Sequence, residues 1–480
     1  FSDNRQQAAF FAAYLERAQK KILQRRLITK MLFKQSQLDM GEPMHVPDCL
    51  PPLIKLADQY KIFHTDESIR NKRIEVAVWL MQEFSGLDKR ISLEGVGLVY
   101  FQPKYGSGWV LPEVLNQSPW NLTADEAKNL LIILLNTLRR QGAVTYLLED
   151  EGIDLLSERQ NAFQPRNKLF YVRKDIASVT GQKGIYSWVP ALNKKNARLD
   201  YVMRLLKRRH QEMTEEESRR LGLHLLNEIW FYLTGDTSPE RDYWLVRENI
   251  RNEGVLYRLN HHSWEVIPTL SKEGVDKWFV CDKCQNLTPH NLNNVCPTYG
   301  CGGFLQPLSI YNAWYEDNMY RSQYLHEHVV PLEAEEHTAQ WISEKAAEVQ
   351  KDFIVGKINV LSSSTTFELG VDVGDLNAVV LRNMPPSSAN YIQRAGRAGR
   401  RTDSVAMVVT FAQRRPHDLM FYESPETMVS GKIRPPIVSL KNDKIIRRHL
   451  HSVVFAAFFR WVKDNFDIEY RNVGNFVDPE

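Results

Sequence analysis

The chain has 480 residues, of which 43% are hydrophobic and 25% are charged. This length allows about three domains, and the apolar content is ordinary for a globular protein with a sizeable core. The net charge of +3 is too small to indicate a particular class of partner. No apolar run approaches the ~20 residues needed to cross a bilayer, so we expect a cytoplasmic protein that does not contact membranes.

The first well-marked helix begins at a capping box. Thr123–Glu126 (TADE) supplies the two side chains of such a box, and Gly142 is suited to close the helix that follows. Residues 144–147 and 169–172 then have the composition of two strands. A helix followed by a two-stranded wing is typical of a winged helix, which we expect over residues 121–192. A packing domain without nucleic-acid contact is the alternative.

Four of the five cysteines are clustered with the spacing C-x₂-C-x₁₁-C-x₄-C; they are Cys281, Cys284, Cys296 and Cys301. Two short knuckles separated by a dozen residues predict a tetrahedral Cys₄ zinc site of the zinc-ribbon type. We expect Gly300, Gly302 and Gly303 to let the second knuckle turn tightly. Free thiols or disulfides are the alternative, and His290 is a second-choice ligand. Four thiolates leave no open coordination position, so a zinc ion here would be structural.

The last third of the chain alternates strands and helices. Lys357–Leu361, Ala378–Arg382 and Ser404–Phe411 are short, β-branched runs that predict buried strands. A helical segment, Thr338–Phe353, precedes the first strand, and Ser387 or Ser388 can cap a helix after the second. This order predicts a parallel sheet with right-handed crossovers, whose ligands bind at the carboxyl ends of the strands.

An arginine-rich segment, Gln393–Arg400 (QRAGRAGR), follows the second of these strands. Its guanidinium groups recur every third residue, and its glycines remove side chains that would block a close approach. Guanidinium forks match the oxygens of a phosphoryl group in transfer. A solvated basic helix or an arginine-rich nucleic-acid patch is the alternative. Because Gly370–Asp372 (GVD) lies on the preceding loop of the same sheet, we favour a nucleoside triphosphate site.

These segments resemble motifs of superfamily 2 helicases. Ser363–Asp375 (SSTTFELGVDVGD) resembles motif V, Gln393–Arg400 resembles motif VI, and Phe1–Ala12 (FSDNRQQAAFFA) is similar to motif IV. All three motifs belong to the second RecA-like lobe. The resemblance implies a DNA helicase or translocase that uses ATP with Mg²⁺.

The resemblance also implies roles for individual residues. Arg397 and Arg400 would be the arginine fingers, which act on the transferring phosphoryl group. The expected nucleotide contacts are Gly370, Asp372, Gln393 and Arg394. The expected contacts to the nucleic-acid backbone are Arg5, Ser364 and Thr365.

The separation of motif IV from motif V by some three hundred residues requires a large insertion. We therefore expect a RecA-like α/β lobe interrupted by an α+β insertion that contains the zinc ribbon and the possible winged helix. The expected parts are 1–40 (first part of the lobe), 41–120 (helical), 121–192 (possible winged helix), 193–275 (helical), 276–310 (zinc ribbon), 324–425 (second part of the lobe) and 426–480 (C-terminal helical extension). This organisation resembles the large bacterial helicases of antiphage islands, of the Druantia type and relatives.

No segment fits the P-loop pattern G-x-x-x-x-G-K-[ST], because Gly356-Lys357 and Gly431-Lys432 are both followed by isoleucine. We expect the first RecA-like lobe to lie on a missing part of a larger protein, and this chain to be inactive alone. Other expected partners are DNA, as a single strand or a junction, and further defence proteins. A DNA-stimulated ATPase that remodels a partner, and a non-enzymatic zinc scaffold, are the competing functions.

Overall fold

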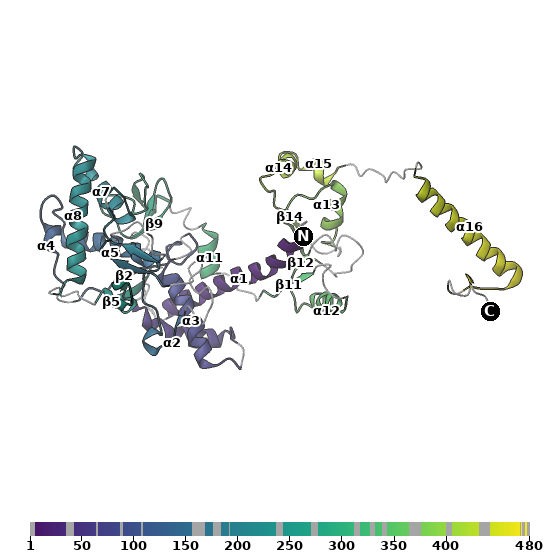
Figure 1. The fold of residues 1–480 in the computed structure, drawn as a ribbon, viewed down its shortest axis with the longest axis horizontal. Coiled ribbons are helices and arrows are strands. Elements are labelled where there is room, and N and C mark those ends of the chain that lie inside the picture. Colours follow the sequence, from purple (N-terminus) through teal and green to yellow (C-terminus); the bar gives the residue numbers. More distant parts are fainter. Residues whose placement is uncertain are drawn as a thin grey trace. The chain divides into compact units, whose positions relative to one another are not determined.

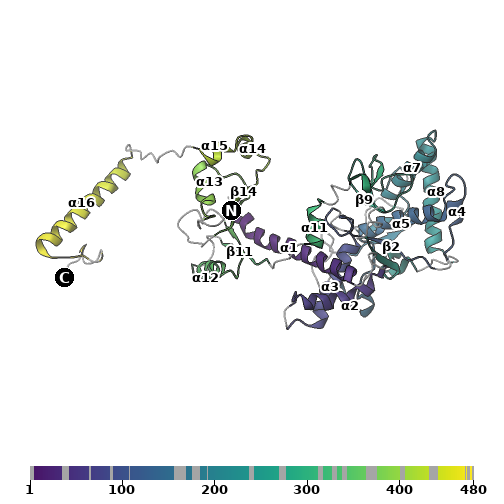
Figure 2. The same ribbon diagram turned by 180° about the vertical axis from the view of Figure 1, so that it is seen from behind.

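A computed structural model gives the fold of the chain (Figures 1 and 2). It describes residues 5–34, 43–63, 66–86, 90–106, 109–155, 169–175, 184–191, 193–236, 243–269, 277–311, 317–326, 332–337, 343–363, 376–399, 406–431, 442–470, 472 and 476–477, with the backbone alone at 5–10, 34, 310–311 and 343. These residues form two compact units. Unit 1 comprises Phe1–Ala13 and Glu333–Glu480, and unit 2 comprises Tyr14–Leu332.

Unit 1 contains two parallel strand–helix–strand repeats. In the first, β11 (Ala334–His337) and β12 (Val360–Ser363) pair in parallel and are connected through α12 (Ser343–Ile354). In the second, β13 (Ala378–Leu381) and β14 (Met407–Thr410) pair in parallel and are connected through α13 (Ser388–Ala395). The predicted parallel pairing is confirmed, although each strand has four residues and the strands expected at 357 and 404 begin three residues later.

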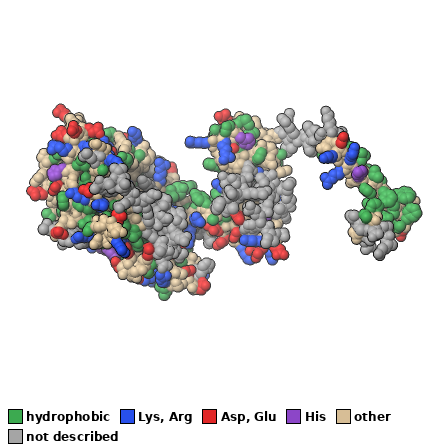
Figure 3. Space-filling view, in the orientation of Figure 1, with side chains coloured by type: hydrophobic (Ala, Val, Ile, Leu, Met, Phe, Trp, Pro, Cys, Tyr) green, Lys and Arg blue, Asp and Glu red, His purple; other side chains and the backbone are tan. Residues whose placement is uncertain are grey.

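Three further helices follow in unit 1: α14 (Pro416–Glu423), α15 (Glu426–Val429) and α16 (Asp443–Phe466). Figure 1 shows α14 and α15 grouped with α13. Hydrophobic side chains gather along the C-terminal part of α16 (Figure 3), where Val454 and Trp461 are more than half exposed. Among the described residues, no helix combines the length and the apolarity that a membrane span requires.

Unit 2 mixes helices with three small sheets. The sheets have the strand orders β1-β7-β2, β4-β3-β6-β5 and β10-β8-β9. The strands are β1 (Met44–His45), β2 (Val99–Pro103), β3 (Tyr171–Arg173), β4 (Ile185–Ser187), β5 (Leu245–Ile250), β6 (Gly254–Leu259), β7 (Trp264–Pro268), β8 (Phe279–Cys281), β9 (Leu287–Thr288) and β10 (Leu305–Pro307). The helices are most of α1 (Arg5–Lys34), α2 (Leu50–Gln59), α3 (Ile69–Phe84), α4 (Glu113–Asn116), α5 (Ala124–Gln141), α7 (Ala197–Arg209), α8 (Glu215–Thr234) and α11 (Met319–Leu325), with 3₁₀ turns at Pro47–Cys49, Glu149–Glu151, His261–Ser263 and Leu308–Tyr311.

Helix α5 lies at the centre of the unit 2 core. The predicted capping box is present, with Thr123 accepting the backbone N–H of Glu126 and the Glu126 carboxylate accepting that of Thr123, and Gly142 ends the helix at φ +79°. From its last turn, the fully buried Arg139 donates two hydrogen bonds to Glu94, at 2.8 and 2.6 Å. Burial alone would raise the pKa of Glu94, but the nearby Arg139 holds it below the ordinary value.

The strands expected to form the wing of a winged helix do not pair with each other. Val144 makes an isolated bridge with Leu259, while Val172 of β3 pairs with Tyr257 of β6 and β3 runs parallel to β4. The structure therefore corrects the prediction of a two-stranded wing. The reason is that β6, which lies far along the chain, offers both segments a partner that a local sequence pattern cannot show.

Candidate functional site

The arginine-rich segment follows the carboxyl end of β13 and begins inside α13. Of the two serines predicted as possible caps, Ser387 caps this helix by accepting the backbone N–H of Asn390, and the helix ends at Ala395. Arg394 is therefore in the last turn of the helix, whereas Arg397 lies in the turn beyond it. The two arginines thus lie in different local structures, because the chain leaves the helix at Gly396.

Beyond the helix, the chain returns to the start of β13. Ala398 forms a parallel bridge with Leu376, and the backbone N–H of Gly399 donates to Leu376 O at 3.0 Å. Gly399 has φ +72°, and a Cβ there would lie 2.6 Å from Cβ of Ala406. Both the left-handed backbone and the close approach require glycine at this position. This turn fixes Arg397 next to the amino end of β13, whereas the sequence predicted ligand contacts at the carboxyl ends of the strands.

The two described arginines are buried within unit 1. Arg394 is 1% exposed and Arg397 is 9% exposed, and both have interaction partners within the protein. Gln393, by contrast, is exposed on the surface of α13. The structure thus brings Gln393, Arg394 and Arg397 together on one short segment, with the two guanidinium groups packed inward.

The start of α13 is held by the helices that follow β14. Ser388 Oγ donates to Thr427 O of α15 at 3.1 Å. A Cβ at Gly431 would lie 2.1 Å from Ser388 Oγ, so this contact also requires a glycine. Asp418 of α14 accepts the backbone N–H of Met384, in the loop before α13. The arginine segment is therefore positioned by contacts from α14, α15 and Gly431, which follow it in the chain.

Several of the expected site residues lie outside the described part of the chain. Of the nucleotide and nucleic-acid contacts expected from the sequence, these are Ser364, Thr365, Gly370, Asp372 and Arg400. Arg5 begins α1, and its backbone alone is described. Phe11, farther along α1, lies within unit 1, where Arg382 at the end of β13 stacks on its ring at 4.0 Å.

The four clustered cysteines converge on the sheet β10-β8-β9, with their sulfur atoms all within 4.8 Å of one another. Cys281 and Cys301 have Sγ atoms 3.7 Å apart, and Cys284 and Cys296 have Sγ atoms 3.6 Å apart. A disulfide would require about 2.05 Å. Four sulfurs around a tetrahedral zinc ion, each at about 2.3 Å, would be separated by about 3.8 Å. The arrangement therefore fits a metal ion and excludes disulfide pairing in this state.

The surroundings of the cysteines also fit metal binding. Three of the four are buried, and Cys284 is half-buried. Burial alone would raise the pKa of Cys284, but the neighbouring Thr298 hydroxyl, 3.5 Å from Sγ, and the backbone N–H of Asn286 lower it to about 7. The thiolate is the form that binds metals, and Cys284 is readily ionised, whereas burial raises the pKa of Cys281 and of Cys296. His290, the second-choice ligand, is instead a core residue whose Nδ1 lies 3.3 Å from Asn129 Oδ1.

Only part of the glycine prediction for the second knuckle is confirmed. Gly300 has φ +67°, and a Cβ at Gly303 would lie 2.6 Å from Cys281 Sγ, so both positions depend on glycine. Gly302 has open space around its Cα and φ outside the left-handed range. The sequence pattern could not separate these three cases, because the neighbour that limits Gly303 comes from the other knuckle.

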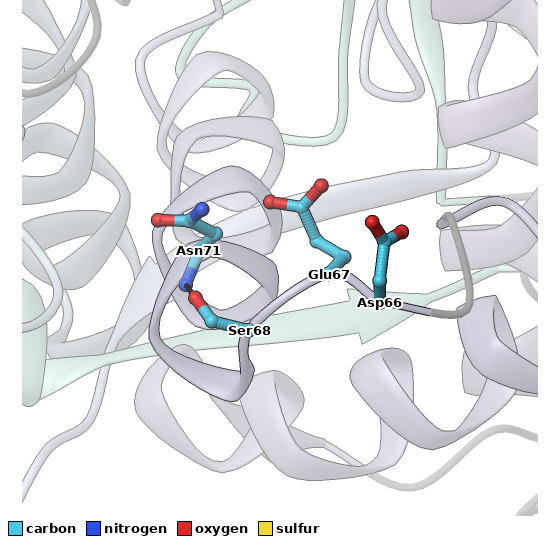
Figure 4. Close-up of a pocket in the computed structure, with 4 residues that line it drawn as sticks. All are labelled: Asp66, Glu67, Ser68 and Asn71. Carbon is cyan, nitrogen blue, oxygen red and sulfur yellow. Dashed lines mark hydrogen bonds between the residues drawn. The ribbon is translucent and has the colours of Figure 1, made fainter.

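A separate polar depression of about 490 Å³ lies at the start of α3 (Figure 4). It is lined by Asp66, Glu67, Ser68 and Asn71. Ser68 Oγ accepts the backbone N–H of Asn71 at 3.2 Å, and acidic residues here complement the helix dipole. Helix capping accounts for these residues, and we assign no ligand to the depression.

Residues 309–402 match the family model of the helicase conserved C-terminal domain. This match covers β11 to α13 and the arginine segment, and it ends before β14. This region is thus similar to the C-terminal, RecA-like lobe of superfamily 2 helicases, as the motif resemblance predicted.

Among individual proteins, the chain is 37% identical over 204 residues to the Druantia protein DruE of Escherichia coli, covering 38% of this chain and 11% of that protein. It is 33% identical over 114 residues to an uncharacterised ATP-dependent helicase of Methanocaldococcus jannaschii, covering 22% of this chain and 16% of that protein. A crystal structure of the helicase MrfA bound to DNA and AMPPNP shares 24% identity over 27% of this chain and 18% of that one, with a TM-score of 0.24. The chain therefore spans a small share of these relatives.

Proposed function

We propose that this chain is the C-terminal RecA-like part of an ATP-dependent nucleic-acid helicase or translocase, with DNA as the favoured substrate. The observation that carries the proposal is the position of the arginine segment. The segment begins in the last turns of α13 and returns to the amino end of β13, inside the region that matches the helicase C-terminal domain.

In this proposal Mg²⁺ and ATP bind between this lobe and a first RecA-like lobe that supplies the P-loop lysine. Arg397 and Arg400 stabilise the charge that develops on the transferring phosphoryl group. Gln393 and Arg394 lie beside the triphosphate, and the loop residues Gly370 and Asp372 lie near the ribose. Without the first lobe, the chain would lack half of the site and should not hydrolyse ATP.

The burial of Arg397 adds a requirement to this mechanism. Its side chain is 9% exposed and has an interaction partner within the protein, so its guanidinium group must become more accessible to reach a bound triphosphate. Closure of the two lobes around ATP would supply the anionic partner that favours this rearrangement. The finger would then act only in the closed state, as enzymes that couple hydrolysis to movement require.

Arg5, Ser364 and Thr365 are proposed to hold the nucleic-acid backbone. Phosphate contacts position a strand but carry no sequence information. Movement along the strand should therefore tolerate any sequence. Binding should weaken as the salt concentration rises, because protein contacts to phosphates release counterions from the nucleic acid.

We further propose that the four clustered cysteines bind one structural zinc ion. The donor set is saturated by four thiolates, so the ion would stabilise the β10-β8-β9 sheet and take no part in catalysis. The role in antiphage defence is proposed on the similarity to the Druantia protein alone.

The experiment is an ATPase and strand-displacement assay on the full-length protein, with single-stranded DNA or RNA as the activator. A helicase should hydrolyse ATP when nucleic acid is present and should displace a paired strand. Hydrolysis without displacement would indicate a remodelling ATPase, and no hydrolysis with any nucleic acid would indicate a scaffold. The stronger activator identifies the substrate class.

A further inference from the structure

One arginine of α7 binds the second cysteine knuckle through its backbone. Arg204 Nη1 donates to the carbonyl oxygens of two ligand candidates, Cys296 at 2.7 Å and Cys301 at 2.9 Å. Its Nη2 donates to the carbonyl oxygen of Thr298, between them, at 3.1 Å. The knuckle is therefore curled around one guanidinium group.

A carboxylate one helical turn earlier completes this arrangement. Asp200 Oδ2 accepts from Arg204 Nε at 3.0 Å and from Nη2 at 2.9 Å. The same oxygen accepts the backbone N–H of Gly300 at 3.0 Å. Gly300 has φ +67°, so this bond stabilises the left-handed turn that brings Cys301 back toward Cys296. The pair Asp200–Arg204 thus fixes the knuckle at four backbone positions.

We propose that Arg204 and Asp200 are positioning residues for the metal: α7 shapes half of the four-cysteine site before the ion binds. The inference depends on the proposed zinc site and extends it to residues outside the cysteine motif. Residues that orient metal ligands from behind commonly contribute 10- to 100-fold in metal affinity. Arg204 also places a positive charge close to a site that would carry two net negative charges when four thiolates hold Zn²⁺.

The chemistry requires arginine at this position. Three carbonyl oxygens and one carboxylate are bound by a single planar group, whose donors point in fixed directions. A lysine ammonium has three donors on one atom and cannot reach the same set. Lysine should therefore retain the charge but lose most of the positioning.

The body of α7 is firmly anchored in unit 2, so the knuckle rests on a rigid support. Leu199, Val202, Leu205 and Leu206 are completely buried. Figure 1 shows α7 beside α8, and at their contact a Cβ at Gly222 would lie 2.9 Å from Leu199 Cδ1. Loss of the metal should consequently destabilise α7, and substitutions that destabilise α7 should weaken metal binding.

The experiment measures zinc affinity on the full chain by competition with a chromophoric chelator. Arg204→Ala should weaken zinc binding at least tenfold, and Arg204→Lys and Asp200→Asn should each weaken it by a smaller factor. The matched control is Arg208→Ala, which removes the same charge from the same helix. Arg208 lies over the exposed ring of Phe304 and has no hydrogen bond to the knuckle among the described contacts. The zinc affinity of Arg208→Ala should stay within twofold of that of the parent chain.

The outcomes separate this inference from the metal proposal. If the parent chain binds no zinc, the metal proposal fails and this inference fails with it. If the parent chain binds zinc and Arg204→Ala matches it within twofold, positioning by α7 is wrong while the metal site stands. Should Arg204→Ala not fold, Arg204→Lys and Asp200→Asn decide, since unchanged affinity in both would overturn the inference. Equal losses in Arg204→Ala and Arg208→Ala would also overturn it, because charge alone would then explain the effect.

Discussion

Asp418 Oδ2 accepts the backbone N–H of Met384 at 3.1 Å, and thereby fixes the loop that joins β13 to α13. The same oxygen accepts the backbone N–H of Gln413, after β14, at 2.9 Å. One buried carboxylate thus ties together the carboxyl ends of two parallel strands. Because α13 starts four residues after Met384, Asp418 also sets where the arginine segment begins.

Asp418→Ala should therefore destabilise unit 1 and displace α13. Two hydrogen bonds to a buried carboxylate are lost, and we expect a loss of about 2 kcal/mol in the free energy of unfolding. Urea denaturation measures the loss, and hydrogen exchange at β13 and β14 locates it. Asp464 is exposed, so Asp464→Ala is the matched control and should change neither the free energy of unfolding nor the hydrogen exchange. Equal stability of the two variants would contradict the role of Asp418.

The stability that Asp418 provides should depend on pH. Burial alone would raise the pKa of Asp418, but the backbone N–H groups of Gln413 and Met384, with His417 nearby, hold it below the ordinary value. A carboxyl whose pKa is lower in the folded state stabilises fully above its unfolded pKa of about 3.9 and loses this contribution as pH falls below that value. The stability gap between the parent chain and Asp418→Asn should thus narrow from pH 6 to pH 3. A constant gap would refute the assignment.

Two neighbouring glycines give a sharp test of the metal site. A Cβ at Gly303 would lie 2.6 Å from Cys281 Sγ, whereas a Cβ at Gly302 meets nothing within 4 Å. Gly303→Ala should push the first cysteine out of place and lower the zinc content of the purified chain, while Gly302→Ala should retain one zinc per chain. Elemental analysis measures both. Full zinc content in Gly303→Ala would contradict the role of this close approach in holding Cys281 at the metal site.

The buried pair Glu94–Arg139 predicts the behaviour of unit 2. Glu94→Gln would leave a fully buried guanidinium without its anion, and such a change typically costs about 3–5 kcal/mol. Thermal unfolding of the chain measures the effect. Glu228→Gln, on the exposed side of α8, is the control and should shift the midpoint little. An unchanged midpoint in Glu94→Gln would mean that Arg139 is satisfied by its other partners.

Local sequence signals predicted the parts of this protein that depend on local contacts. The capping box at Thr123, the cap at Ser387 and the parallel repeats were all predictable, because each follows from residues close together in the chain. The four cysteines were predictable for a different reason, since their spacing has few structural uses other than metal binding.

The contacts that join distant segments were not predictable. Arg204 and the carbonyl of Cys296 are separated by 92 residues, and Asp418 and Met384 by 34. In both cases a charged side chain binds a backbone group, which nearly every residue type offers, so no sequence pattern marks the backbone partner. The prediction of a two-stranded wing was also wrong because of a distant contact: Val172 pairs with β6, which lies far along the chain.

The most direct test of the central claim is the nucleic-acid-stimulated ATPase rate of the full-length protein with Arg397→Ala. Loss of an arginine finger should lower the rate by about 10³-fold or more, while nucleic-acid affinity should stay near that of the parent protein. Arg382→Ala, which removes the guanidinium stacked on Phe11, is the control for arginine loss in the same unit. A rate for Arg397→Ala close to that of the parent protein would contradict the account.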